Sequence, residues 1–107
     1  MKFDINNYPG KYVMHCKTEE EAQIFTSYLH RIGKTWVTGS SYTDQLGFAY
    51  GEDSCYNFNK GTHANINTYK DASYTILEFE NFDWDDISLS EIDIKTIDDF
   101  MSQFKIN

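Results

Sequence analysis

The stretch EFENFDWDD, residues 78–86, holds the densest group of side chains in this sequence that could do chemistry. It combines five carboxylates with three large aromatic rings in nine positions. Carboxylates attract basic surfaces, and an aromatic ring beside them can anchor a protein partner. The stretch is therefore the first candidate for a protein-binding surface, and its candidate residues are Glu78, Glu80, Asp83, Trp84, Asp85 and Asp86.

The negative charge of the chain is concentrated in its last third. The net charge is −8 over 107 residues, and residues 73–107 hold nine acids against two lysines, a net of −7. Such a field repels the phosphates of nucleic acids and attracts basic proteins, including proteins with nucleic-acid-binding grooves. We therefore expect a basic protein partner and no direct contact with nucleic acid. The alternative is that the charge serves only solubility.

A second group of residues could bind a small anion. Its members are Arg31, Lys34, Trp36 and Tyr42, with His63 as a further candidate. Cations beside stackable rings can hold a nucleotide. The alternative is that Trp36 is a core residue of a strand, because most tryptophan side chains are buried.

The sequence contains no recognisable motif for catalysis, metal binding or phosphate binding. The three histidines do not match a metal-ligand spacing, and NFNKGT, residues 57–62, lacks the first glycine of a phosphate-binding loop. Alternation along a strand would point His15 and Cys16 to opposite faces, so they could not act together as base and nucleophile. We expect no metal, no cofactor and no enzymatic activity.

The pattern of apolar residues predicts one α+β domain over residues 1–107. It predicts a β-α-β start, a small antiparallel sheet packed against one main helix, and a closing C-terminal helix. Strands are expected at residues 11–16, 34–39, 54–59, 63–69 and 74–80, with a hairpin turn at residues 70–73.

The first helix has clear signals at both of its ends. Thr18 and Glu21 fit a capping box, and apolar side chains then recur at intervals of three, four and three residues. Gly33 is the expected left-handed cap at its C-terminal end. The closing helix is expected from Ile94 onward, where a similar apolar face recurs.

The predicted strand 74–80 determines how the acidic stretch is presented. Alternation along this strand leaves its two glutamates facing the solvent. A turn near Asn81 would then bury Phe82 and Trp84 and leave the aspartates outside, whereas a continued strand would expose both rings. We expect the turn.

The remaining signals concern the cellular compartment. Neither Cys16 nor Cys55 belongs to a CxxC pair, so we expect two reduced thiols in a cytoplasmic protein. The amino end lacks the apolar run of a signal peptide, and no stretch reaches the length of a membrane span.

Three segments together resemble a recurrent type of small protein from phages and prophages of Gram-positive bacteria. The segments are YVMHCKTEEEAQIFTSYLHRIGKTWVTG, CYNFNKGTHANIN and YTILEFENF, and they cover most of residues 11–82. The resemblance implies an accessory protein that counters host defence by binding, as anti-CRISPR proteins and sponges for nucleotide immune signals do. It implies no catalytic residues.

Two hypotheses follow from the sequence. The first is a non-catalytic counter-defence protein whose acidic stretch binds a basic host immune protein. The alternative is a sponge that sequesters a nucleotide signal through the group around Trp36. A homo-oligomer is compatible with either hypothesis.

Overall fold

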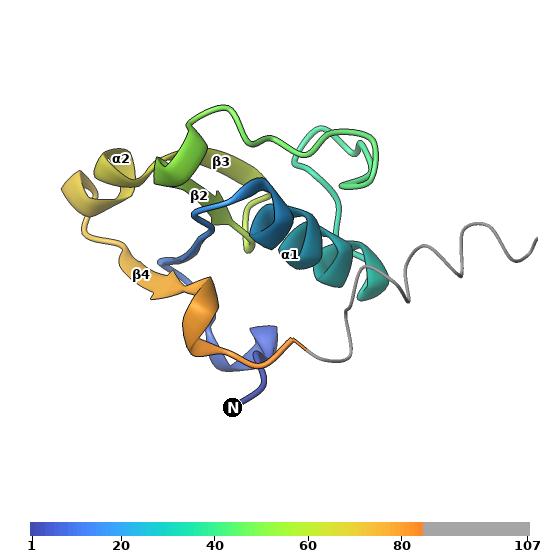
Figure 1. Ribbon diagram of the computed structural model, residues 1–107, viewed down its shortest axis with the longest axis horizontal. Helices are drawn as coiled ribbons and strands as arrows, with labels where there is room; N and C mark the ends of the chain where they lie inside the picture. Colours follow the sequence, from blue (N-terminus) through green and yellow to red (C-terminus); the bar gives the residue numbers. More distant parts are fainter. Residues whose placement is uncertain (85–107) are drawn as a thin grey trace, which may run out of the picture.

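The computed structural model describes residues 1–84, which form one mixed sheet of four short strands with a helix on each face (Figure 1). The strands are β1 (Tyr12–His15), β2 (Ser54–Asn57), β3 (Thr62–Asn65) and β4 (Thr75–Glu78), and the helices are α1 (Glu19–Arg31) and α2 (Ile66–Asp71). Single 3-10 turns lie at η1 (Ile5–Asn7), η2 (Gly51–Asp53) and η3 (Phe79–Asn81). The predicted α+β class is confirmed, and the predicted closing helix lies outside the described residues.

The strand order is β3-β2-β1-β4, and the last strand was predicted with the wrong direction. Strands β1, β2 and β3 pair antiparallel, but β4 runs parallel to β1, with Val13 opposite Ile76. A parallel neighbour needs a crossover connection, and α2 supplies it between β3 and β4. The predicted hairpin at residues 70–73 is therefore wrong, because the chain crosses from one edge of the sheet to the other.

Helix α2 replaces the second half of the predicted strand 63–69. The side chain of Asn65 caps this helix by accepting a hydrogen bond of 2.9 Å from the backbone N–H of Asn67. Asparagine is among the strongest N-cap residues, because its oxygen satisfies a backbone donor at the start of a helix. Tyr69 then packs inward from α2 beside Val13 and Cys55.

Helix α1 begins and ends as its sequence predicts. Thr18 accepts a hydrogen bond of 3.1 Å from the backbone N–H of Glu21, and the Glu21 carboxylate accepts one of 2.8 Å from the N–H of Lys17. These contacts satisfy backbone donors that the first turn leaves free. The helix stops before Gly33, whose φ of +87° is unfavourable for residues with a side chain. Its buried face includes Phe25 and packs on the sheet.

The predicted strand at residues 34–39 is wrong. The backbone N–H of Trp36 donates to the carbonyl of Ser40 at 2.9 Å, and that of Gly39 donates to Trp36 at 2.8 Å. These bonds close a turn within the segment. The N–H of Val37 reaches the carbonyl of Gly61 at 2.9 Å, in the turn between β2 and β3. The chain after α1 therefore forms a loop that is attached to the sheet at this turn.

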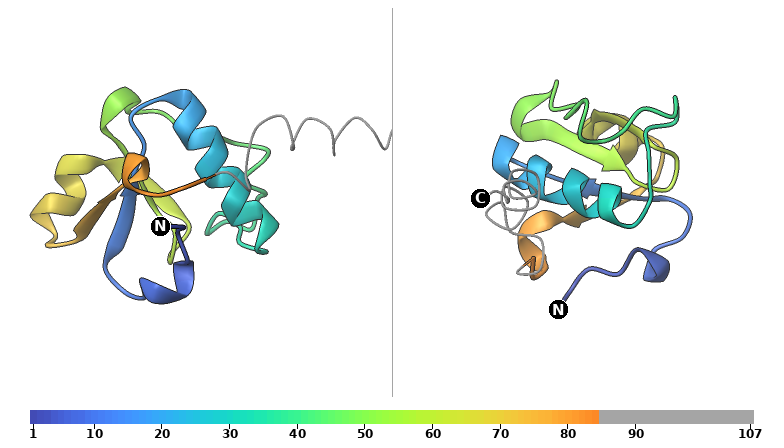
Figure 2. Two further views of the ribbon diagram at one scale, coloured as in Figure 1. Left: turned by 60° about the horizontal axis from the view of Figure 1, so that its bottom comes forward. Right: turned by 90° about the vertical axis from the view of Figure 1, so that its right-hand side faces the viewer.

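The two faces of the sheet are covered differently, and Figure 2 shows α1 and α2 on opposite sides of the strands. The α2 face is small and includes Val13, Cys55 and Ile76. The α1 face holds a group of rings that we call the aromatic cluster: Phe3, Tyr8, Phe25, Tyr28, Phe58, Phe79, Phe82 and Trp84. Ring pairs of this kind stabilise a core beyond the area that they bury.

The N-terminal segment contributes to this core although it contains no strand of the sheet. The ring of Phe3 lies 5.4 Å from Phe82 and 5.7 Å from both Phe25 and Trp84 between centroids. The same segment runs beside the end of the described chain, where Lys2 forms a parallel bridge with Asp83 (Figure 1). Phe3 therefore joins the start of the chain to the acidic stretch.

Candidate functional site

The turn that was predicted near Asn81 is present and turns two rings inward. Turn η3 follows β4, and Phe82 and Trp84 are partly buried in the aromatic cluster. The indole of Trp84 stacks on Phe79 with 4.6 Å between centroids, and its Nε1 donates to the Phe79 carbonyl at 2.8 Å. Trp84 thus holds the acidic stretch in place, and its ring is not free as an exposed anchor.

Glu80 and Asp83 are exposed, and we call this pair the acidic edge. Glu80 receives a hydrogen bond of 3.1 Å from the ammonium group of Lys17. Asp83 receives one of 2.7 Å from the amino group of Met1, and this bond holds the pKa of Asp83 below its usual range. Water screens exposed ion pairs, so both carboxylates can exchange these cations for others. The candidates Asp85 and Asp86 lie outside the described residues.

Glu78 differs from Glu80, because it does not face the solvent freely as predicted. Its carboxylate lies 2.8 Å from Nδ1 of His15, which is 8% exposed. Nε2 of the same ring lies 2.7 Å from the carbonyl oxygen of Glu52, so Nε2 must donate. The contact with Glu78 then needs a proton between Nδ1 and the carboxylate. Glu78 and His15 therefore form a structural pair between adjacent strands.

The structure brings together only half of the second candidate group. Trp36 and Tyr42 are 7% and 2% exposed, and their rings lie 4.5 Å apart. Burial raises the pKa of Tyr42 to about 12. Arg31 is exposed at the end of α1, and Lys34 is half-buried in the segment after it. Neither cation lines the space beside Trp36.

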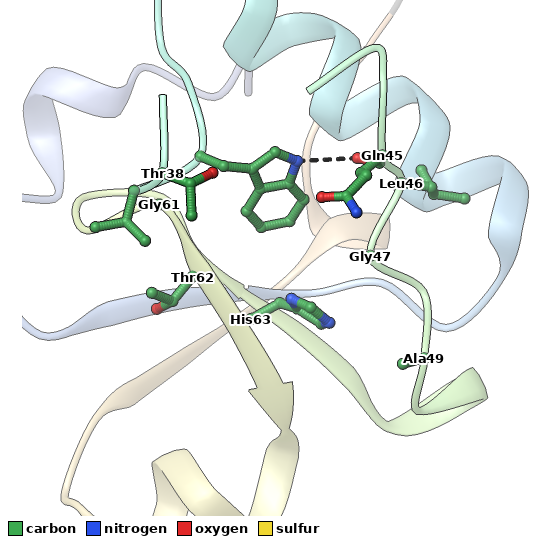
Figure 3. Close-up of a pocket in the computed structure, with 10 residues that line it drawn as sticks. Thr38, Gln45, Leu46, Gly47, Ala49, Gly61, Thr62 and His63 are labelled. Atoms are coloured by element: carbon green, nitrogen blue, oxygen red, sulfur yellow. Dashed lines mark hydrogen bonds between the residues drawn. The ribbon is translucent and has the colours of Figure 1, made fainter. Parts of the chain in front are cut away.

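That space is an open cavity of about 530 Å³. It is lined by residues 36–38, 45–47, 49 and 61–63, and Figure 3 shows the labelled side chains of Thr38, Gln45 and His63 around it. The indole Nε1 of Trp36 donates to the Gln45 carbonyl at 3.0 Å, which fixes the ring against the loop. The sequence pointed to Trp36 and His63, but gave no signal for the loop around Gly47.

His63 is the one titratable side chain among the residues that line the cavity. Its ring lies 5.4 Å from Trp36 and stacks at 6.1 Å on Tyr56. Burial lowers the pKa of His63, so the ring is neutral at pH 7. Within the described part of the chain, neither ring nitrogen has a hydrogen-bond partner. The cavity therefore offers one donor and one acceptor on a neutral ring.

Acid is expected to destabilise the fold through His63. Because burial lowers its pKa, the unfolded chain binds a proton there more readily than the folded chain. Stability is therefore lost as the pH falls from the ordinary histidine pKa of about 6.5 toward the lower pKa of the folded state. Between about pH 7.5 and pH 5.5, the melting temperature of a His63→Phe variant should fall less than that of the wild type. Equal losses in the two proteins would contradict this role of His63.

The two thiols are poorly suited to chemistry. Cys16 and Cys55 are buried and free. Burial raises the pKa of Cys16 well above its ordinary value and that of Cys55 to about 12, so the reactive thiolate is scarce at pH 7. Over residues 1–84, no three His, Cys, Asp or Glu side chains come together in a way that could hold a metal ion.

The described residues thus present the acidic edge beside β4 and the cavity beside β3, at opposite edges of the sheet. None of the helices formed by residues 1–84 has the length and apolar character needed to cross a membrane. No protein-family model, no curated protein and no solved structure matches this chain.

Proposed function

We propose that this chain is a non-catalytic counter-defence protein of a phage or prophage. It acts in the host cytoplasm and inhibits an immune protein by binding, in the manner of an anti-CRISPR protein. The acidic edge docks on a basic surface of that partner, where nucleic acid would otherwise bind. The observation that carries this proposal is the exposed acidic edge. It lies at and just after the turn η3, within the most acidic third of the chain.

The packing behind the acidic edge supports a role in binding. The backbone of this segment is fixed on one side by the Trp84 hydrogen bond to Phe79. On the other side, the N–H of Asp83 donates to the carbonyl of Met1 at 2.9 Å. A surface that is already ordered loses less conformational entropy when it binds. The carboxylates can therefore be presented to a partner without first folding the turn.

The net charge of the sequence segment that contains the acidic edge supports a basic partner. Residues 73–107 carry a net charge of −7, and this segment includes both Glu80 and Asp83. A concentrated field of one sign accelerates encounter with a surface of opposite sign and disfavours partners of the same sign. The cations of nucleic-acid-binding grooves are such a surface, because they are arranged to meet phosphates.

A sponge for a nucleotide signal receives less support. A phosphorylated ligand needs cations close to its phosphates, as in most phosphate sites. The residues that line the cavity carry no charged side chain, and the ring of His63 is neutral at pH 7. The overall charge of −8 also repels an anion. The acidic edge is therefore the better basis for a function.

Reversing the charge of the acidic edge is expected to abolish inhibition of host immunity. The variant Glu80→Lys/Asp83→Lys should weaken partner binding by at least about tenfold, because it places two cations against a basic surface. The measurement is plaque formation on Gram-positive strains that each carry one immune system, CRISPR–Cas9 among them, with the chain expressed. The wild type should restore plaques on one strain, and the variant should not.

The matched control is Asp44→Lys/Asp71→Lys, which changes the net charge equally at exposed positions away from the acidic edge. It should restore plaques as well as the wild type does, and the partner should co-purify with both. If both charge-reversed proteins fail alike, net charge and not the acidic edge explains the effect. If the wild type restores plaques on none of the strains, the proposed function is wrong.

A further inference from the structure

We propose that the cavity beside Trp36 is a binding site for an uncharged, flat nitrogen heterocycle of nucleobase or nucleoside size. This site goes beyond the proposed function, because it lies across the sheet from the acidic edge and uses none of its residues. Its volume of about 530 Å³ falls in the range of about 300–1,000 Å³ that is usual for pockets of small ligands.

Glycine at position 47 lets its loop pack directly against two aromatic side chains. A Cβ atom at Gly47 would lie 2.8 Å from Cη2 of Trp36 and 3.3 Å from Nδ1 of His63. The φ of +74° at this position also favours glycine. The loop can therefore pass close to both rings without filling the space beside them. Trp36 is 7% exposed, so a flat ligand in the cavity would reach only the edge of its indole, beside the partly exposed imidazole of His63.

The lining of the cavity selects against charge in the ligand. Among the lining residues, Val37 and Leu46 are apolar, and Thr38 and Gln45 are polar without charge. Moving a phosphate or carboxylate into such a site removes water from it and supplies no cation in return. An uncharged ring loses less hydration and gains contact with apolar side chains. The site therefore favours a base or nucleoside over its phosphate.

His63 gives the site a means of recognising a nitrogen heterocycle. Its neutral imidazole has one N–H donor and one acceptor nitrogen, and neither has a partner within residues 1–84. Partly buried polar groups gain most from a ligand that completes their hydrogen bonds. Nucleobases carry adjacent donors and acceptors on a flat ring, and this pattern matches the imidazole together with the Gln45 amide.

Titration of the full chain with nucleosides tests this site. Trp36 and Trp84 are the two tryptophans, so Trp84→Phe leaves Trp36 as the single tryptophan, whose emission is followed. Adenosine, cytidine and uridine are added up to about 5 mM, which detects dissociation constants near the millimolar range. At least one nucleoside should change the Trp36 emission saturably, and its 5′-monophosphate should bind at least about tenfold more weakly. The same nucleoside should raise the melting temperature of the wild type.

Three variants make the test specific. His63→Phe keeps a ring but removes both nitrogens, so affinity should fall by about threefold to tenfold. Glu20 and Asp71 are exposed and do not line the cavity, so Glu20→Lys and Asp71→Lys should bind the nucleoside as tightly as the wild type does. The proposal is overturned if no nucleoside binds, if the monophosphate binds more tightly, or if His63→Phe binds unchanged. Because this readout uses purified protein and no host factor, it is independent of the plaque assay.

Discussion

Replacing Phe3 with alanine is expected to lower the free energy of unfolding by about 3–5 kcal/mol, the usual range for removing a buried ring. Phe3 is 6% exposed and lies 5.4 Å from the rings of Tyr28 and Phe58. It also contacts both Phe82 and Trp84, so its removal leaves a cavity between the two ends of the described chain. Urea unfolding followed by circular dichroism measures the change.

The Phe3 variant should also disturb the acidic edge. Phe82 and Trp84 flank Asp83, and both lose a ring contact when Phe3 becomes alanine. Under conditions in which the variant is still folded, its plaque restoration should be weaker than that of the wild type. Phe3→Leu is the control, because leucine fills most of the space and should cost less stability. A loss below about 1 kcal/mol in Phe3→Ala would show that the N-terminal segment contributes little to the core.

The elements that could be predicted are those with signals inside their own sequence. Helix α1 has a cap at Thr18, one apolar face and Gly33 at its end, and the structure places all three as expected. Strands β1, β2 and β4 were also located correctly, each ending one or two residues before its predicted end. Such local signals work because caps, periodicity and positive φ depend on few neighbouring residues.

The elements that could not be predicted depend on distant partners. The segment around Trp36 has the composition of a strand, but within residues 1–84 it pairs with no strand of the sheet, and the N–H of Val37 donates instead to Gly61 in the turn between β2 and β3. The role of Phe3 depends in part on rings more than 50 residues away, and no pattern near the N-terminus indicates it. Helix α2 had a local signal in Asn65, but the β-rich composition around it favoured a strand.

The candidate site likewise combines features that local sequence signals predict with features that depend on distant residues. The turn before Phe82 follows from alternation and the need to bury rings, and it is present. The pairing of Glu78 with His15 depends on the parallel register of β4 beside β1, which the sequence did not indicate. The cavity depends on the loop at Gly47 lying against Trp36, and the spacing of these residues carries no pattern. Single candidate residues could thus be identified from the sequence, but their arrangement in space could be seen only in the folded structure.

Gly61→Ala is expected to lower the free energy of unfolding by about 2–3 kcal/mol. Gly61 has a φ of +78°, which costs a residue with a side chain roughly 1–2 kcal/mol. A Cβ atom there would also lie 2.6 Å from the backbone nitrogen of Val37 and 2.8 Å from the carbonyl oxygen of Thr35. These atoms belong to backbone, so the loop must move and strain the hydrogen bond from Val37 to Gly61, worth about 0.5–1.5 kcal/mol.

Comparison with Gly39→Ala separates the cost of the positive φ from the cost of the collision between the Cβ atom and the loop. Gly39 also has a positive φ, +92°, but a Cβ atom there would have no neighbour within 4 Å. It should therefore show only the conformational cost of roughly 1–2 kcal/mol, without the collision. Because residues 35–37 carry Trp36, Gly61→Ala should also change the Trp36 emission in the Trp84→Phe background, and Gly39→Ala should change it less. If both variants lose the same stability and leave the emission unchanged, the close approach of the loop to Gly61 does not hold Trp36 at the cavity.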